Sequence, residues 1–298
     1  MKSKLNLILL FLSFTFLYVQ AQTTPYLEFE DIDQSGIPVT TLFQDNQEQL
    51  WVCTQEGMYI YDGITLQKNA NWTSPDLRSR CIRCVYKINS EEYYVGSESG
   101  IYLFYLKTGS LTLIPQTAGI DVRVIAKFDD NTLWLGTMNG VLKFNTESMH
   151  TEKVDEIDSF PVVSIQYNQE RRSVYFSNNR GFFEYNLSSQ AYTFVPLPIK
   201  NGKSYLIHAM AYDKKHNCLW IGAEKVFFKY DIVEGEFEEK QLSSDNTISV
   251  ITVDSSGNVW VGTDSGICVY NPDMDREELL QDTSQNIKNV IWAIFEDK

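Results

Sequence analysis

The sequence predicts an all-β protein, a β-propeller with six complete four-stranded blades and a partial seventh. One phrase, clearest between Asp254 and Asn271, recurs around six aromatic residues: Trp51, Tyr94, Trp134, Tyr175, Trp220 and Trp260. These aromatics follow one another at 43, 40, 41, 45 and 40 residues, a period typical of propeller blades. Within each repeat, short runs of alternating apolar and polar residues predict strands.

Each unit begins with a predicted first strand rich in β-branched residues. The six stretches are 39–43, 82–88, 122–128, 162–167, 207–212 and 248–253. A turn containing Asp or Asn follows, because these side chains bond readily to nearby backbone. A weaker fourth strand closes the units, as at 110–114, 191–195 and 235–241.

The second predicted strand carries the large aromatic and, two residues later, a small residue. This column contains Cys53, Gly96, Gly136, Ser177, Gly222 and Gly262, and we expect neighbouring blades to come close there. Four residues further on, five units have a glycine that we expect at positive φ in a hairpin turn: Gly57, Gly100, Gly140, Gly181 and Gly266. Val226 stands there in the fifth unit, so that turn should differ, because β-branched residues resist positive φ.

The third predicted strand ends on an aromatic residue in every unit. These residues are Tyr61, Phe104, Phe144, Tyr185, Tyr230 and Tyr270. They could form a platform on which sugars stack, but their constant register favours a core between the blades.

The first 21 residues have the pattern of a signal peptide, and residues 22–298 are predicted to form a single propeller domain. Lys2 and Lys4 precede an apolar run, Leu5–Val19, which is shorter than the roughly 20 residues of a membrane span. The chain is therefore expected to be exported, with no membrane contact of its own.

The chain ends inside a further repeat, which begins at about residue 289 and matches only a first strand. We expect Tyr26–Glu30 and Val290–Phe295 to share the incomplete seventh blade and to close the ring. On this interpretation the chain is a truncated product or the front part of a longer protein.

The charge excludes two classes of partner. The formal net charge is −14, and it becomes more negative when Lys2 and Lys4 are removed with the signal. Nucleic acids and anionic membrane surfaces are disfavoured, since both require a basic footprint.

No catalytic, metal-binding or cofactor-binding constellation is recognisable. The three histidines, His150, His208 and His216, show no ligand-like spacing, and no phosphate-binding loop or calcium loop is present. Cys81 and Cys84 have C-x-x-C spacing without a second pair. We therefore expect the five cysteines, especially Cys53 and Cys268, to be small buried side chains, and we expect no metal and no cofactor.

The phrase Asp-x-x-Gly-Asn-Val-Trp-Val-Gly-Thr-x-x-Gly-Ile-x-x-Tyr-Asn at Asp254–Asn271 resembles the two-component regulator propeller repeat. The opening unit, Tyr26–Gly63, is similar to the first blade of that family, and the resemblance covers essentially the whole mature chain. It implies the periplasmic sensor region of Bacteroidetes hybrid two-component systems, which detect glycan fragments. Family members continue into further sensor domains, a membrane helix and a histidine kinase.

The resemblance implies a non-catalytic periplasmic sensor with an oligosaccharide as its ligand, here without a kinase. Its other partners would be the downstream sensor domains or a second copy of the chain. Two alternatives stay open: a secreted propeller enzyme that acts on polysaccharide, and a protein-docking scaffold. The enzyme would need convergent carboxylates or a Tyr/His/Arg cluster on one face.

Ligand contact is expected at the turns between second and third strands, which gather on one face of a propeller around the central channel. The candidates are Glu56, Glu98, Asn139, Asn178, Arg180, Lys225 and Asp264. Arg180 is the most suggestive, because a guanidinium can form two hydrogen bonds to a carboxylated or sulfated sugar. The alternatives are a solvated turn chosen for solubility and an interface with other domains.

Overall fold

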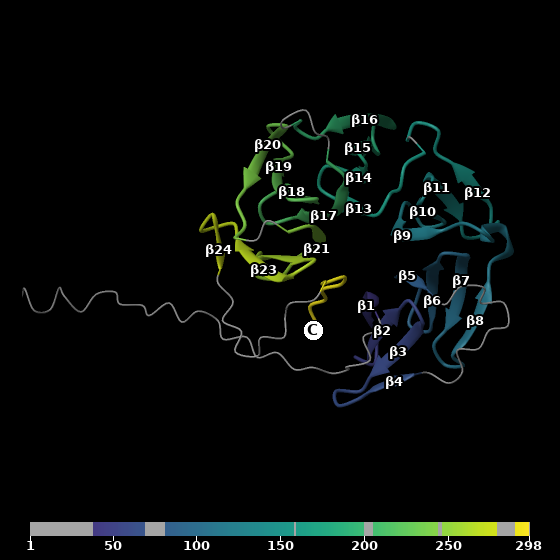
Figure 1. The fold of residues 1–298 in the computed structure, drawn as a ribbon. Helices are drawn as coiled ribbons and strands as arrows, with labels where there is room; N and C mark the ends of the chain where they lie inside the picture. The colour runs from purple at the N-terminus through teal and green to yellow at the C-terminus, as the bar shows by residue number, and fades with distance from the viewer. Residues whose placement is uncertain are drawn as a thin grey trace, which may run out of the picture.

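The structure is a computed structural model that describes residues 38–68, 81–157, 159–199, 205–243, 246–278 and 290–297. These residues form six four-stranded antiparallel sheets arranged in a ring (Figure 1). The six-bladed propeller predicted from the repeat is therefore confirmed. The signal peptide and Tyr26–Glu30 lie outside the described residues.

Every sheet is a meander in which each strand pairs with the next strand along the chain. Blades 1 to 3 consist of β1 (Val39–Gln44), β2 (Leu50–Thr54), β3 (Gly57–Tyr61), β4 (Leu66–Lys68), β5 (Ile82–Lys87), β6 (Glu92–Ser97), β7 (Gly100–Tyr105), β8 (Ser110–Leu113), β9 (Val122–Lys127), β10 (Thr132–Thr137), β11 (Gly140–Asn145) and β12 (Thr151–Lys153). Blades 4 to 6 consist of β13 (Ile165–Asn168), β14 (Ser173–Asn178), β15 (Gly181–Asn186), β16 (Ala191–Pro196), β17 (Ile207–Asp213), β18 (Cys218–Ala223), β19 (Val226–Asp231), β20 (Glu236–Lys240), β21 (Ile248–Val253), β22 (Val259–Thr263), β23 (Gly266–Asn271) and β24 (Arg276–Glu278). The only helical turn among the described residues is a 3-10 turn, Pro115–Thr117, and no helix there is long and apolar enough to cross a membrane.

The first strand of each blade lies innermost, and the first strands of successive blades contact one another around the ring (Figure 1). Because each blade is a meander, its second–third turn lies at one end of the sheet and its other two turns lie at the opposite end. We call the end with the second–third turns the turn face. The other end carries the first–second and third–fourth turns, and we call it the opposite face.

Large aromatics fill the space between blades. The aromatic of a second strand packs against the third-strand aromatic of the next blade, which confirms the core interpretation of both columns. The pairs and their ring-centroid separations are Trp51–Phe104 at 5.3 Å, Tyr94–Phe144 at 5.8 Å, Trp134–Tyr185 at 5.5 Å and Trp220–Tyr270 at 5.3 Å. Between blades 4 and 5, the ring of Phe182 stands between Tyr175 and Tyr230.

The ends of this aromatic series differ from its middle. Trp51, Trp134 and Trp220 are at most 2% exposed, whereas Trp260 of blade 6 and Tyr61 of blade 1 are only half-buried. These two are the first and last members of the two columns around the ring.

The column of small residues brings neighbouring blades together, as expected. A Cβ added at Gly136 would lie 2.7 Å from the carbonyl oxygen of Val162 in the next blade, and one at Gly222 would lie 2.4 Å from Cγ2 of Ile248. In blade 4 the column holds Ser177, whose Oγ accepts hydrogen bonds of 3.0 Å from the backbone N–H groups of Val163 and Ser164. These bonds occupy N–H groups that would otherwise extend the sheet, so β13 begins at Ile165 and not at 162 as predicted.

The second–third turns follow two patterns. In blades 1, 2, 3 and 6 the residue before the turn is Ser or Thr, and its hydroxyl donates to the carbonyl of the glycine that follows the turn, as Thr137 does to Gly140 at 2.9 Å. The glycines of these four turns have positive φ: Gly57, Gly100, Gly140 and Gly266. The hydroxyl and the glycine therefore define one turn type.

The positive φ expected at Gly181 is wrong. Blades 4 and 5 have Asn178 and Ala223 where the other blades have the hydroxyl. Gly181 is required for another reason: a Cβ there would lie 2.1 Å from the carbonyl oxygen of Val195. Val226 is tolerated because its φ is not positive, so the expectation that its turn differs is confirmed.

Residues 290–297 pack against blade 6, and in Figure 1 this yellow segment is drawn between β21 and β1. The N–H of Ile291 donates to the carbonyl of Thr263 at 2.9 Å. No strand is assigned within residues 290–297, so the described fold has six blades.

Candidate functional site

Six of the seven predicted site residues have exposed side chains on the turn face. They are Glu56, Glu98, Asn139, Arg180, Lys225 and Asp264, and they stand on six different hairpins around the ring. The meander topology therefore gathers them on one face but distributes them around it.

Asn178, the seventh, is only 3% exposed. Its Oδ1 accepts a hydrogen bond of 3.3 Å from the backbone N–H of Arg180. The side chain lies inside the turn, where it occupies the place that a threonine hydroxyl takes in other blades.

Arg180 stands at the tip of this turn, with its guanidinium 5.8 Å from the ring centroid of Phe160. Its carbonyl accepts the N–H of Leu197 at 2.9 Å, so the backbone beneath the side chain is fixed. An exposed guanidinium beside an aromatic ring can receive a carboxylate or a sulfate while the ring supports its apolar stem.

A second group of charges lies where the inner strands of blades 2 and 3 reach the turn face. Arg83 forms an ion pair with Glu98, and its Nε is 3.9 Å from Asp121 Oδ1. Arg123 binds Asp121 Oδ2 at 3.0 Å. The Nε atoms of both arginines are buried without a hydrogen-bond partner. The positive charges of the two guanidiniums are neutralised by the two carboxylates, so an anion that binds here would have to displace a carboxylate.

Arg83, Asp121 and Arg123 were not among the site residues predicted from the sequence, although a signal was present. The register between first and second strands shifts around Arg83 and around Arg123, which marks a β-bulge that re-aims the extra residue. The same shift occurs in blades 1, 5 and 6, around Thr40, His208 and Ser249. Aligning the repeats on their first strands would have shown this polar column.

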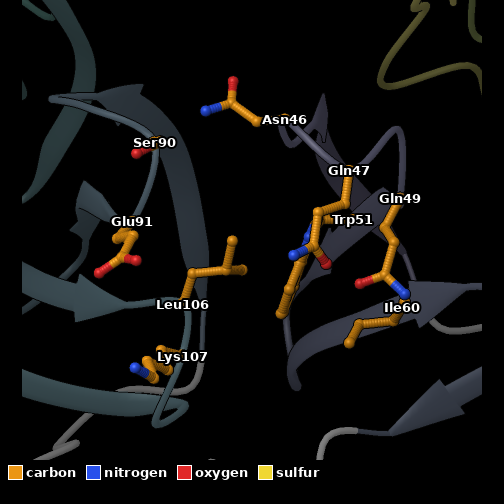
Figure 2. Close-up of a pocket in the computed structure, with 9 residues that line it drawn as sticks. All are labelled: Asn46, Gln47, Gln49, Trp51, Ile60, Ser90, Glu91, Leu106 and Lys107. Carbon is orange, nitrogen blue, oxygen red and sulfur yellow. The ribbon is translucent and has the colours of Figure 1, made fainter.

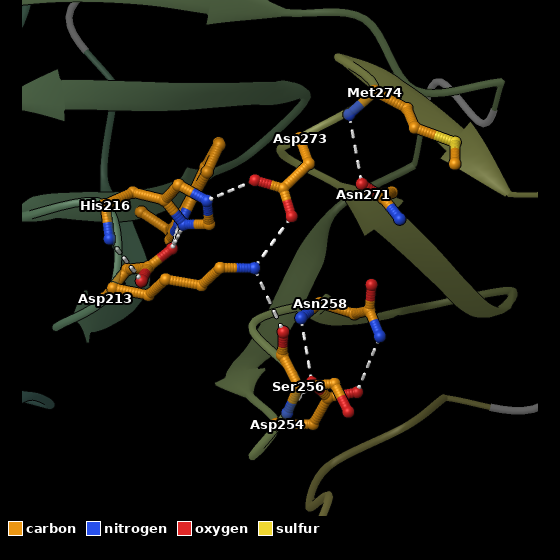
Figure 3. A network of polar contacts seen from close by, with 10 residues as sticks. Asp213, His216, Asp254, Ser256, Asn258, Asn271, Asp273 and Met274 are labelled. Atoms are coloured by element: carbon orange, nitrogen blue, oxygen red, sulfur yellow. Dashed lines mark hydrogen bonds and ion pairs between the residues drawn. The ribbon is translucent and has the colours of Figure 1, made fainter.

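A polar network lies on the opposite face, between blades 5 and 6 (Figure 3). His216 Nδ1 is 2.7 Å from Oδ2 of the buried Asp213, and its Nε2 is 3.1 Å from Asp273 Oδ1. Lys215 Nζ donates to Asp273 Oδ2 at 2.7 Å and to the carbonyl of Ser256 at 3.3 Å. The hydrogen bonds from Lys215 and His216 lower the pKa of Asp273.

This geometry fits a connection between blades better than a catalytic dyad. Both ring nitrogens of His216 are engaged by carboxylates, so neither is available to take a proton from a substrate. Asp213 also accepts Trp220 Nε1 at 3.0 Å, which ties the network to the core.

The C-x-x-C pair has the environment of packed thiols. The five cysteines are present as thiols, and burial raises the pKa of Cys81 and raises that of Cys84 to about 12. Cys53 and Cys268 are 0% and 7% exposed, as expected. The described residues contain no cluster of three or more His, Cys, Asp or Glu side chains that could hold a metal ion.

Comparison with known proteins supports the repeat identified above. Residues 242–265 match the family model of the two component regulator propeller, so the chain carries this repeat. No curated protein sequence matches the chain.

Solved structures extend the similarity to nearly the whole chain. The extracellular domain of the putative hybrid two component system BT4673 from B. thetaiotaomicron matches with a TM-score of 0.79 at 24% identity, over 91% of this chain. A second structure of the BT4673 extracellular domain gives a TM-score of 0.77 at 25% identity, and the extracellular domain of BT3049 gives 0.72 at 17%. The chain spans only 37% of the BT4673 domain and 39% of the BT3049 domain.

Enzymes share the same fold. Virginiamycin B lyase from Staphylococcus aureus matches with a TM-score of 0.64 at 12% identity, over 86% of this chain and 88% of the lyase. At this identity the match concerns the fold alone.

Proposed function

We propose that this chain, a six-bladed propeller carrying the two-component regulator repeat, is a non-catalytic sensor module of a hybrid two-component regulator. The observation that carries the proposal is the similarity to extracellular domains of such systems over 91% or more of the chain. The module works in the periplasm, for which the extracellular relatives and the N-terminal signal pattern are the support. A fold alone does not give a function, so the ligand is argued from the turn face.

The ligand class is an oligosaccharide, bound at the turn face. Arg180 is the exposed cation that faces solvent beside an aromatic ring, and it supplies the local positive charge that an acidic sugar requires. The formal charge of the whole chain is −14, so a carboxylated or sulfated sugar is attracted only where such a local cation stands.

A non-catalytic role is supported by the engagement of His216 between two carboxylates. His150 stands next to β12 in blade 3, and His208 lies near the start of β17, at the other end of blade 5 from His216. On this proposal the chain signals by binding a ligand and by contacting neighbouring domains or a second copy of the chain, without catalysing a reaction.

Calorimetry with neutral and acidic oligosaccharides tests the proposal. Binding of an acidic oligosaccharide that weakens about tenfold in Arg180→Ala, and is unchanged in Lys214→Ala, would support it. Lys214 is the matched control, because it is an exposed cation on the opposite face. Cleavage of a glycan by the wild-type chain would contradict the non-catalytic assignment, and absence of heat with every glycan would contradict glycan sensing.

We also propose that residues 290–297 form the inner strand of an incomplete seventh blade. Ile291 occupies the place against Gly262 that Ile248 occupies against Gly222. Ser249 Oγ donates to the carbonyl of Ile291, and Thr252 Oγ1 donates to that of Ile294 at 3.4 Å. The half-buried Trp260 would gain a third-strand aromatic from the rest of such a blade.

A further inference from the structure

A cavity of about 540 Å³ opens between blades 1 and 2 on the opposite face, away from the predicted site residues (Figure 2). Most of its lining comes from the first–second turns of both blades and from the turn after β7, and the rest from β2 and β3. The residues are Asn46, Gln47, Gln49, Trp51, Ile60, Ser90, Glu91, Leu106 and Lys107. In Figure 2 the blade 1 side chains face those of blade 2 across the opening.

The blade 1 wall is held from beneath by one buried carboxylate. Asp45, 4% exposed, accepts the backbone N–H groups of Gln47 at 2.8 Å and Gln49 at 3.1 Å through Oδ1, and Trp51 Nε1 at 2.9 Å through Oδ2. With their backbone fixed in this way, the exposed side chains of Gln47 and Gln49 project from a rigid turn.

The blade 2 wall is fixed in a similar manner. Asn89 Oδ1 accepts the N–H of Glu91 at 2.9 Å, and the carbonyl of Glu91 accepts the N–H of Leu106 at 2.8 Å. The two turns of blade 2 are therefore joined, and the cavity is largely preformed. Preformed walls reduce the ordering that a ligand must impose on the protein.

The corresponding place between blades 5 and 6 is closed. There Lys215 and His216 of one first–second turn reach Asp273 in the third–fourth turn of the next blade (Figure 3). In blade 1 the positions after the buried Asp45 carry Asn46 and Gln47, whose neutral side chains line the cavity. Asn46 Oδ1 accepts a hydrogen bond from Lys87 Nζ of blade 2, but no ion pair crosses this junction among the described residues. Of these two equivalent junctions, one is bridged by ion pairs, whereas the other is crossed by a neutral amide and leaves a cavity.

The lining specifies the chemistry of the ligand. Three amide side chains and one serine hydroxyl can each donate and accept hydrogen bonds, and the single acid, Glu91, is balanced by the single cation, Lys107. Trp51 is only 2% exposed, so it contributes an edge and no stacking platform. Leu106 and Ile60 are half-buried and supply a small apolar floor.

We propose that this cavity binds a small neutral polyhydroxylated molecule, of the size of one or two sugar rings, through the amides of Gln47 and Gln49 and the Nδ2 group of Asn46. The volume lies within the range of about 300–1,000 Å³ found for small-molecule sites. The choice of a sugar over another polyol rests on the proposed function; the position and neutrality of the site rest on the lining alone.

The test uses the full chain and a panel of glucose, galactose, mannose, cellobiose and maltose, with glucuronate as the charged comparison, in ligand-observed NMR and calorimetry. Removing the amides in the double variant Gln47→Ala, Gln49→Ala should weaken the binding of the preferred neutral sugar at least about tenfold. Gln169→Ala is the matched control, an exposed glutamine in the first–second turn of blade 4, and it should bind as the wild type does. Ser90→Trp, which fills the cavity from the blade 2 wall, should also abolish binding.

The outcomes separate this inference from the proposed function. Neutral-sugar binding that survives both cavity variants, or no neutral-sugar binding in the wild type, would overturn the inference. Loss of acidic-oligosaccharide binding in Arg180→Ala concerns the turn face only. An acidic ligand that depends on Arg180, together with no neutral ligand, would therefore support the proposed function and refute the cavity site.

Discussion

Ile291 packs against Gly262 so closely that a Cβ on the glycine would lie 2.7 Å from Ile291 Cγ2. The residue next to Gly262 also holds Ile291, since the carbonyl of Thr263 accepts a hydrogen bond from the N–H of Ile291. Small residues in this column allow each blade to receive the inner strand of its neighbour. The C-terminal segment thus uses a contact that the repeat also makes at Gly96, Gly136 and Gly222.

Gly262→Ala should displace residues 290–297 and leave blades 1 to 5 intact. The added methyl group meets the branched side chain of Ile291 and, at 2.6 Å, Val250 Cγ1 on the inner strand of blade 6. Hydrogen exchange should rise in residues 290–297 and remain unchanged in β5–β7. Gly63→Ala is the control, because nothing lies within 4 Å of a Cβ there although its φ is +91°. Unchanged exchange in Gly262→Ala would contradict the packing role of Ile291.

Trp134→Ala should destabilise the fold by about 3–5 kcal/mol, the range for deletion of a buried aromatic. Trp134 is 0% exposed and contacts Phe176 and Tyr185 of the next blade. Trp260→Ala should cost less, because Trp260 is half-buried at the end of the series. Urea denaturation of the two variants measures the difference, and equal losses would show that the end of the series is as well packed as its middle.

Asp213→Ala should cost about 2–4 kcal/mol, because it leaves buried donors without an acceptor. Asp213 accepts Trp220 Nε1 and the backbone N–H of His216, and it is 0% exposed. Asp129→Ala is the matched control. Asp129 stands in the same turn of blade 3, where Trp134 Nε1 has no hydrogen-bond partner, so its removal should change the free energy of unfolding by less than about 1 kcal/mol. A comparable loss in both variants would argue against the role of the buried acceptor.

Stability should decline in acid. Backbone N–H groups of Thr65 and Ile64 lower the pKa of Asp62, and those of Glu234 and Val233 lower the pKa of Asp231. For a carboxyl with a lowered folded-state pKa, the stabilisation is complete above its unfolded pKa, about 3.9, and is lost as the pH falls through the folded-state value. The melting temperature should therefore be level above about pH 5 and fall below about pH 4. A melting temperature that rises on acidification would contradict this sign.

Three buried or half-buried thiols should resist alkylation in the folded protein. Burial raises the pKa of Cys53 and raises those of Cys84 and Cys218 to about 12, so the thiolate is scarce at pH 8. Mass spectrometry after brief iodoacetamide treatment should find these three unmodified in the native state and fully modified in urea. Rapid native labelling of Cys84, or a Cys81–Cys84 disulfide, would indicate a redox role for the C-x-x-C pair.

The pattern of residues within a single repeat was sufficient to predict the blades and the turn face. The columns of aromatic and small residues repeat with the period of one blade, so their shared position followed from the fold class alone. Gly57 and Gly266 could be assigned positive φ on the same basis. The same prediction was wrong for Gly181. Glycine is needed there because a Cβ would meet the carbonyl of Val195 on the neighbouring strand.

The candidate sites depended on contacts that no single repeat contains. Arg83 meets Asp121 across a blade boundary, and the cavity is lined by turns of two blades, with Asn46 and Lys107 on opposite walls. The sequence determined the strands, the turns and the face on which each turn lies, because these follow from periodicity within one blade. Only the tertiary structure decided which junction is bridged by ion pairs and which leaves a cavity, because that depends on the particular side chains that adjacent copies of the repeat bring together.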